Sequence, residues 1–179
     1  MSNPGVSIAV VGATGAVGQE FLKVVEQRKF AATRIKLLAS KRSAGKRITV
    51  LGRELVVEET LPVVDTFKGV DIAFISVNSD ISKKLAPLAV QAGALVIDDS
   101  SAFRMDPSVP LVVPEINGAD LEWHKGITSI PNCSTTQMVM ALYPIHRVNP
   151  IRRIIVDTYQ SVSGTGAAAM RELRDESRV

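Results

Sequence analysis

Hydrophobic and polar residues follow two alternating patterns along most of the chain. Residues 6–11 form a short, mostly β-branched run, whereas the apolar residues that follow the next glycine-rich stretch recur at helical spacing. Similar short runs predict strands at residues 34–39, 48–50, 55–57, 70–77, 95–97, 111–113 and 126–130. Parallel strands need crossover connections, so strands alternating with helices predict an α/β fold with a doubly wound parallel sheet.

Local signals refine this outline. Residues 48–50 and 55–57 would pair as a small hairpin around Leu51 and Gly52. Residues 79–92 place apolar side chains on one helical face, with Pro87 expected to kink or restart the helix and Gly93 to close it. A helical turn at 119–124 completes this part of the chain.

The pattern changes after Pro131. A helix at residues 133–146, a strand at 153–158 and a helix at 165–178 follow, and these three elements cannot enclose a core of their own. We therefore divide the chain into a nucleotide-binding domain, 1–131, and the incomplete beginning of a second domain, 132–179. We expect the chain to be the first part of something larger and to be prone to aggregation through uncovered apolar faces.

Composition and charge narrow the class of protein. The 179 residues are 46% apolar and 22% charged, which is typical of a globular protein rather than a disordered one. No apolar run approaches the ~20 residues of a membrane-spanning helix and the N-terminus does not resemble a secretory signal, so we expect a cytoplasmic protein. A net charge of +3 without basic runs favours small anionic ligands over nucleic acid or a membrane surface.

The first chemical signal is a glycine-rich turn between the first strand and the first helix. Tight turning and close backbone approach let a phosphate reach the free amides at the start of the helix. Glycine spacing alone is also found in ordinary turns, but a strand before and an amphipathic helix after it favour dinucleotide binding. The candidate residues in this turn are Gly12, Thr14, Gly15, Ala16, Val17 and Gly18.

A second polar segment follows the strand at 34–39. An acidic residue here would bind the ribose hydroxyls of NAD, whereas this chain has Ser40, Lys41, Arg42 and Ser43. Two cations and two hydroxyls suit a 2′-phosphate, so NADP is the favoured cofactor, with Ser40, Arg42 and Ser43 as candidate ligands. The alternative is a solvated surface loop.

The single cysteine, Cys133, lies in the sequence Pro-Asn-Cys-Ser-Thr-Thr-Gln at the start of a predicted helix. The positive end of the helix dipole and nearby amides favour a thiolate there, and the neighbours are polar. A lone cysteine is also commonly an inert core residue, so local chemistry leaves both interpretations open.

Together these motifs resemble the aspartate-semialdehyde dehydrogenase family, in order and in spacing, over essentially the whole chain. The segments that carry the resemblance are residues 12–18, 40–45, 100–104, 113–117, 131–137 and 159–164. The resemblance implies NADPH-dependent reductive dephosphorylation of L-4-aspartyl phosphate to L-aspartate 4-semialdehyde. This reaction leads toward diaminopimelate, lysine, threonine, methionine and isoleucine.

The resemblance also implies roles for individual residues. Cys133 would displace phosphate from the acyl phosphate to give a thioester that hydride then reduces. Arg104 and Asn132 would bind the phosphate, and Gln160 would position the substrate. Ser163 and Gly164 would lie near the nicotinamide end of the cofactor. From the residues alone, Arg104 could equally be a surface ion pair and Gln160 a polar residue at a strand end.

One requirement of the mechanism is not met by this sequence. The family supplies a catalytic histidine and a substrate-binding arginine from a later part of the chain, and full-length members form homodimers. His124 and His146 lie outside the family's catalytic-histidine motif, and we expect both to be structural or exposed. The isolated chain should therefore turn over substrate hardly at all.

Other functions remain as alternatives. An N-acetyl-gamma-glutamyl-phosphate reductase uses the same thioester chemistry but typically has glycine in place of Asn132, and glyceraldehyde-3-phosphate dehydrogenase lacks the Pro-Asn pair. A noncatalytic NADP-binding module is the alternative from a different class. No nucleophile elbow of a serine hydrolase occurs, and neither histidine has a zinc-binding spacing, so no metal site is expected.

Overall fold

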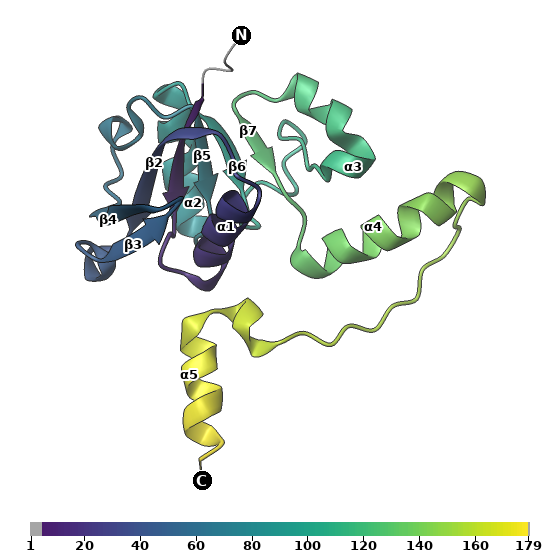
Figure 1. Cartoon of the computed structure of the whole chain (residues 1–179). Helices are drawn as coiled ribbons and strands as arrows, with labels where there is room; N and C mark the ends of the chain where they lie inside the picture. Colours follow the sequence, from purple (N-terminus) through teal and green to yellow (C-terminus); the bar gives the residue numbers. More distant parts are fainter. Residues whose placement is uncertain (1–4, 179) are drawn as a thin grey trace.

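A computed structural model describes residues 5–178, which contain one seven-stranded sheet (Figure 1). The strand order is β3-β4-β2-β1-β5-β6-β7, and every neighbouring pair is parallel except the hairpin β3-β4. The strands are β1 (Val6–Val11), β2 (Ala32–Ala39), β3 (Arg47–Val50), β4 (Arg53–Glu59), β5 (Ile72–Ile75), β6 (Leu95–Asp98) and β7 (Ile127–Ser129). The predicted α/β fold is confirmed.

Helices α1 (Ala16–Gln27) and α2 (Ser79–Gln91) cover opposite faces of this sheet. The other helices are α3 (Pro114–Asn117), α4 (Cys133–Val148) and α5 (Ala167–Glu176). Successive residues of β1 point to opposite faces, so Val10 packs in the cluster beneath α1 while Ala9 and Val11 pack in the cluster beneath α2. The sheet is therefore doubly wound, with β1 at its centre.

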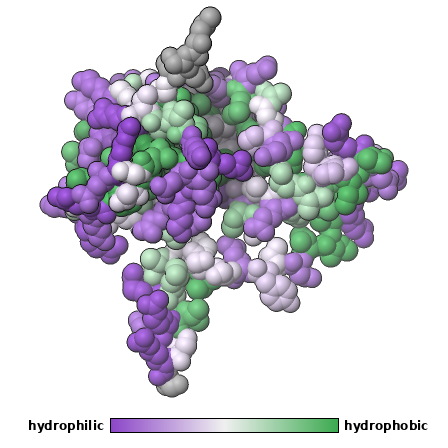
Figure 2. All heavy atoms as spheres, in the orientation of Figure 1, coloured by the Kyte–Doolittle hydropathy of each residue, from purple (hydrophilic) through white to green (hydrophobic). Residues whose placement is uncertain are grey.

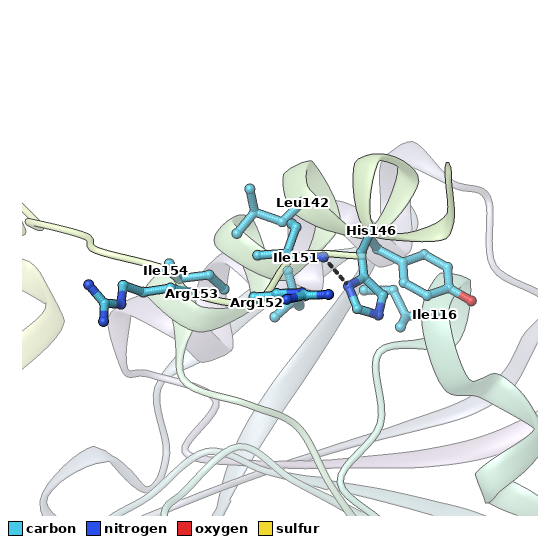
Figure 3. A pocket seen from close by; sticks show the side chains of 9 residues that line it. Ile116, Leu142, His146, Ile151, Arg152, Arg153 and Ile154 are labelled. Atoms are coloured by element: carbon cyan, nitrogen blue, oxygen red, sulfur yellow. Dashed lines mark hydrogen bonds between the residues drawn. The ribbon is translucent and has the colours of Figure 1, made fainter. Parts of the chain in front are cut away.

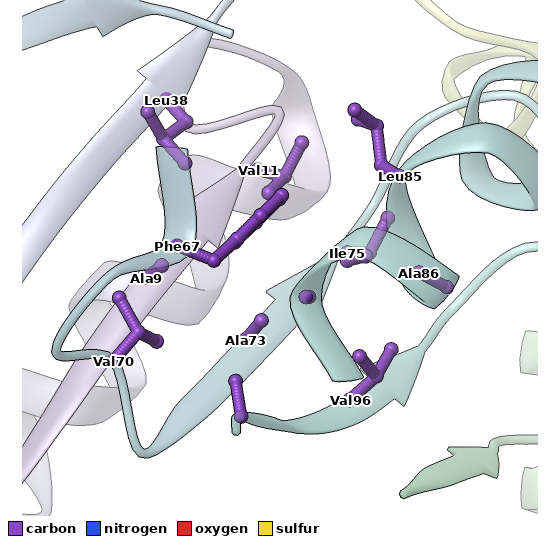
Figure 4. Packing of buried hydrophobic residues seen from close by; sticks show 12 residues of the cluster. Ala9, Val11, Leu38, Phe67, Val70, Ala73, Ile75, Leu85, Ala86 and Val96 are labelled. Atoms are coloured by element: carbon purple, nitrogen blue, oxygen red, sulfur yellow. The ribbon is translucent and has the colours of Figure 1, made fainter. Parts of the chain in front are cut away.

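The α2 face holds a densely buried cluster (Figure 4). Phe67 comes from the short 3₁₀ helix η2 (Val64–Phe67), Leu85 from α2, and Leu38 and Val11 from the central strands. These four side chains are at most 2% exposed, so α2 and η2 are held against the same part of the sheet. Burial of this apolar area is the main contribution to the stability of this face.

Helix α2 runs without a break through Pro87, and the restart predicted there is wrong. Leu85, Ala86 and Ala89 are buried on either side of the proline, so packing against the sheet offsets the lost backbone hydrogen bond. Gly93, at φ +94°, ends the helix as predicted: its amide bonds to Val90 O and that of Ala94 to Ala89 O.

Two predicted strands are absent from the described part of the chain. At 111–113 only Leu111 forms an isolated bridge, to Ser129, because flanking prolines at positions 110 and 114 lack amide donors for a longer ladder. Residues 153–158 are exposed and unassigned to any strand, because no strand of the sheet lies beside them (Figure 1). A strand forms only where a neighbour pairs with its backbone.

Beyond α4 the chain is open. Residues 149–161 run as an exposed extended segment to a 3₁₀ helix, η4 (Val162–Thr165), and to α5, both of which contain no buried residue. Apolar side chains gather over α4 and the segment beside it, and Val148 and Ile155 are more than four-fifths exposed (Figure 2). Within residues 5–178, no helix combines the length and hydrophobicity that crossing a bilayer requires.

The turn after β1 brings three backbone segments together. Gly12 has φ +88°, and its amide donates to Leu38 O of β2 at 2.9 Å. A Cβ at Gly12 would overlap the backbone carbonyl of Ser76, directly after β5. A Cβ at Gly18 would in turn overlap the carbonyl of Gly12, so glycine is required at both positions for α1 to start this close to the sheet.

Gly12→Ala should lower the free energy of unfolding by about 3 kcal/mol, since it adds backbone strain and a steric overlap. Gly45→Ala is the matched control, because Gly45 also has a positive φ, +83°, but open space where a Cβ would lie. The control should lose about 1 kcal/mol. Urea unfolding of both variants measures the difference, and equal losses would contradict the close approach.

Candidate active site

A crevice of about 440 Å³ opens at the carboxyl ends of the central parallel strands. It lies where the connections from β1 diverge, since β2 pairs on one side and β5 on the other. Ligands bind at such a switch point in open α/β sheets. The lining residues come from the glycine turn, the end of β2, the loop after β4, the end of β5 and α2; they include Gly12, Thr14, Gly15, Ser40, Thr60, Ser76, Val77, Ile81 and Lys84.

The amides of Gly12, Ala13 and Gly15 bond to backbone carbonyls, so the backbone donors without a partner near this crevice are the amides that begin α1. Gly15 is the N-cap of α1, makes no side-chain cap hydrogen bond, and is followed by no acidic residue in the first turn. These amides and the helix dipole suit an anionic group such as a pyrophosphate. Of the predicted cofactor residues in this turn, Gly12, Thr14 and Gly15 line the crevice, Gly18 is buried, and the exposed Ala16 and Val17 do not line it.

The segment after β2 lies beside the glycine turn. Thr14 Oγ1 donates to Ser43 Oγ at 3.2 Å, which joins the two predicted cofactor segments directly. Ser40 lines the crevice, whereas the exposed side chains of Lys41 and Arg42 are not among the lining residues. Thr60 also lines this crevice, and its Oγ1 is buried without a hydrogen-bond partner within residues 5–178. The start of α1 and the polar residue Ser40 at the crevice suit a ligand that carries phosphate, such as a nucleotide.

Cys133 is the first residue of α4 and is exposed. Asn132 caps the helix by accepting from Ser134 N at 3.0 Å, and its Oδ1 lies 3.8 Å from Cys133 Sγ. Gln160, in the extended segment at residues 149–161, has its Nε2 at 3.6 Å from the same sulfur. The structure therefore brings together three of the predicted site residues, although Gln160 is 27 residues from the cysteine.

A groove of about 620 Å³ extends from the cysteine between α4 and the extended segment. Its polar lining includes Cys133, Gln137, Gln160 and Ser161. A Cβ at Gly164 would overlap the amide of Gln160, so the glycine leaves room for the amide beside the sulfur. Gly164 thus lies beside the Gln160 amide, while Ser163 Oγ donates to Ser161 Oγ at 3.1 Å. The role of both residues near a nicotinamide stays a prediction.

Arg104 is half-buried and bound to backbone rather than to a carboxylate. Its Nε donates to Ile130 O at 3.0 Å and its Nη2 donates to Asp99 O at 2.8 Å. Ile130 lies two residues before Asn132, so the guanidinium fixes the strand end that leads to Cys133. This anchored position is compatible with phosphate binding beside the thiol, and it is not the surface ion pair considered as an alternative.

The sequence interpretation missed a pair of acidic residues at the end of β6. Asp98 is fully buried, where it accepts from Ser82 Oγ and, at 2.7 Å, from Ser100 Oγ. Asp99 accepts from Ser76 Oγ, at the nucleotide crevice, at 2.9 Å. Burial raises the pKa of Asp99, and the Ser76 hydrogen bond and the charge of Arg104 oppose this rise. Adjacent aspartates at a strand end were the signal that could have identified this cluster.

Both histidines are exposed and bonded to backbone. His124 Nδ1 accepts from Gly126 N at 3.0 Å, and His146 Nδ1 accepts from Ile151 N at 3.1 Å (Figure 3). His146 lines an apolar groove of about 380 Å³ between the end of α4 and residues 151–154. Both histidines are exposed, as the sequence predicted. No cluster of potential metal ligands occurs within the described range.

Asp99→Asn should change the pH dependence of stability. A raised pKa means that the folded chain binds this proton more tightly than the unfolded chain, so the contribution of Asp99 falls as pH rises from about 3.8 through the raised pKa. The variant should therefore gain stability relative to wild type across that window and then stay level. Urea unfolding at a series of pH values measures the effect.

Asp106→Asn is the control for this experiment. Hydrogen bonds from the Ser108 hydroxyl and amide lower the pKa of the exposed Asp106 carboxyl below 3.8. The wild type should here gain stability relative to the variant as pH rises toward 3.8, the opposite sign. If the stability difference from wild type changes with pH in the same direction for both variants, the inferred effect of burial on the pKa of Asp99 is wrong.

Comparison with known proteins supports the family assignment. The family described as "Semialdehyde dehydrogenase, NAD binding domain" matches residues 7–124, and "Semialdehyde dehydrogenase, dimerisation domain" matches residues 142–178. An aspartate-semialdehyde dehydrogenase of Bacillus subtilis is 53% identical over 174 residues, which are 97% of this chain and 50% of the relative. The chain thus spans about half the length of the curated relatives it matches.

Solved structures give the same result. The aspartate semialdehyde dehydrogenase II of Vibrio cholerae, complexed with ASA, superimposes with a TM-score of 0.90 at 42% identity, covering 97% of this chain and 52% of that one. The Candida albicans enzyme with NADP gives 0.62 at 26% identity, covering 82% and 48%. The resemblance identified from the sequence motifs is confirmed, and the chain belongs to the semialdehyde dehydrogenase family.

Proposed function

We propose that this chain provides the cofactor site and the nucleophile for NADPH-dependent reductive dephosphorylation of L-4-aspartyl phosphate to L-aspartate 4-semialdehyde. The observation that carries the proposal is the exposed Cys133 at the start of α4 with the Gln160 amide 3.6 Å from its sulfur. Support also comes from the names of the relatives and from the NADP in the Candida structure.

The sulfur performs the covalent step. The thiolate of Cys133 attacks the acyl carbon; the new C–S bond forms as the bond from that carbon to the phosphate oxygen breaks, and phosphate leaves with the electron pair. Asn132 and Arg104 contribute neutral and cationic donors to that phosphate. Gln160 orients the substrate over the sulfur. When bound, NADPH supplies the hydride that reduces the thioester carbon, and the C–S bond then breaks to release the aldehyde.

The cofactor would bind with its pyrophosphate on the glycine turn and its adenosine end toward Ser40 and Ser43. Gly12, Thr14, Gly15, Ala16, Val17 and Gly18 form the first part of this site, with Arg42 in the segment after β2. Residues 1–131 would act as the cofactor domain. Residues 132–179 would begin a catalytic and dimerisation domain, since Cys133 and Gln160 both lie there. We propose a homodimer for the complete enzyme, in keeping with the matched dimerisation domain.

The 179-residue chain on its own should lack steady-state turnover. His146 lies 13 residues after Cys133, about 20 Å along α4, and neither histidine lines the groove at the cysteine, so neither is placed to move the proton that collapse of the thiohemiacetal requires. Acylation of Cys133 requires loss of the thiol proton, which is a separate step from proton transfer at the thiohemiacetal. We therefore expect Cys133 of this chain to become acylated without steady-state turnover of substrate.

Acylation can be tested by mass spectrometry, with aspartyl phosphate generated in situ by an aspartate kinase and ATP. Wild-type chain should gain the mass of one aspartyl group, while Cys133→Ala should gain none and Gln160→Ala should acylate about fivefold more slowly, the effect of one lost hydrogen bond. NADPH absorbance should not fall at a catalytic rate. Unmodified wild type would overturn the proposed reaction, and rapid NADPH oxidation would overturn the expected lack of turnover.

A further inference from the structure

The cavity at the strand ends contains a cationic side chain that the sequence motifs do not include. Lys84 is an exposed residue on the second turn of α2, and it lines the crevice together with Ile81, three residues before it on the same helical face, and with the buried Leu85. Lys41 and Arg42, the cations expected to select the cofactor, do not line it. Among the described lining residues, Lys84 therefore carries the only full charge.

The charge of Lys84 is not neutralised by the protein. Within residues 5–178, its ammonium makes no ion pair, although four other pairs involve Lys23, Lys36, Arg47 and Lys68. None of the crevice-lining residues is acidic. An uncompensated cation in an otherwise uncharged crevice attracts an anionic group of the ligand.

The position of α2 indicates which end of a dinucleotide this cation would contact. The helix packs against η2, which follows β4, and Leu85 shares a cluster with Phe67 of η2 and Leu38 of β2. Ser40, at the end of β2, and Thr60, after β4, line the same crevice. The end of β2 is where a dinucleotide-binding fold contacts the adenosine ribose, and the pyrophosphate lies at the start of α1.

We propose that Lys84 is a specificity-determining residue that binds the 2′-phosphate of NADP from the α2 side of the crevice. The inference rests on the proposed cofactor. It adds a cation from outside the segment that follows β2, the place where cofactor choice is ordinarily read from a sequence. An ammonium on a flexible stem suits this role, since it contacts a phosphate as a point charge.

The test compares Lys84→Met with Lys83→Met. Lys83 is adjacent to Lys84 and exposed as Lys84 is, but it does not line the crevice, so both variants lose one exposed charge from the same helix. Calorimetric titration with NADP⁺ should show about fivefold to tenfold weaker binding for Lys84→Met and no change for Lys83→Met. Binding of NAD⁺ should change by less than about twofold in either variant. Thermal unfolding should show that both variants fold as wild type does.

The other possible results contradict the inference about Lys84, the proposed cofactor, or both. If Lys84→Met weakens NADP⁺ and NAD⁺ equally, the lysine acts on the pyrophosphate and the inference is wrong. A preference of wild type for NADP⁺ that survives Lys84→Met overturns the inference and leaves the proposed cofactor intact. Wild-type chain that binds NADP⁺ no more tightly than NAD⁺ overturns both.

Discussion

The close approach of Gly12 to the carbonyl of Ser76 is the constraint on which the crevice depends. It draws the turn after β1 against the end of β5, and the same turn bonds to Leu38 at the end of β2. The ends of β1, β2 and β5 therefore meet at the turn that precedes α1. A side chain at Gly12 would push these strand ends apart and would therefore also separate the walls of the crevice.

The two parts of the candidate site are linked through the end of β6. Ser76 lines the nucleotide crevice and donates to the Asp99 carboxylate, while the backbone oxygen of Asp99 accepts from Arg104. Arg104 in turn holds Ile130, which precedes the cysteine loop. These hydrogen bonds connect the crevice to the segment that leads to Cys133, and the buried Asp98 with its two serine donors lies next to Asp99.

The sequence predicted those features of the fold and of the site that depend on local chemistry. The strand, glycine turn and helix of residues 6–27 are set by spacing and by glycine, and the exposed Cys133 at a helix start follows from its polar neighbours. The extended segment at 153–158 was predicted as a strand because its residues favour one, but strand formation depends on a partner that spacing does not reveal. Lys84 was missed for a related reason: Ser40, Thr60 and Lys84 share a crevice only after three separate elements pack together.

The exposed segment after α4 has a consequence for the reactivity of the thiol. Gln160 is carried by an exposed segment without regular secondary structure that lines the groove beside α4, so the amide is kept at the sulfur by few restraints. Whatever buries residues 152–160 also fixes the amide over the sulfur. The sulfur itself is carried by α4, so covering this segment would change how fast the thiol reacts rather than whether it can react.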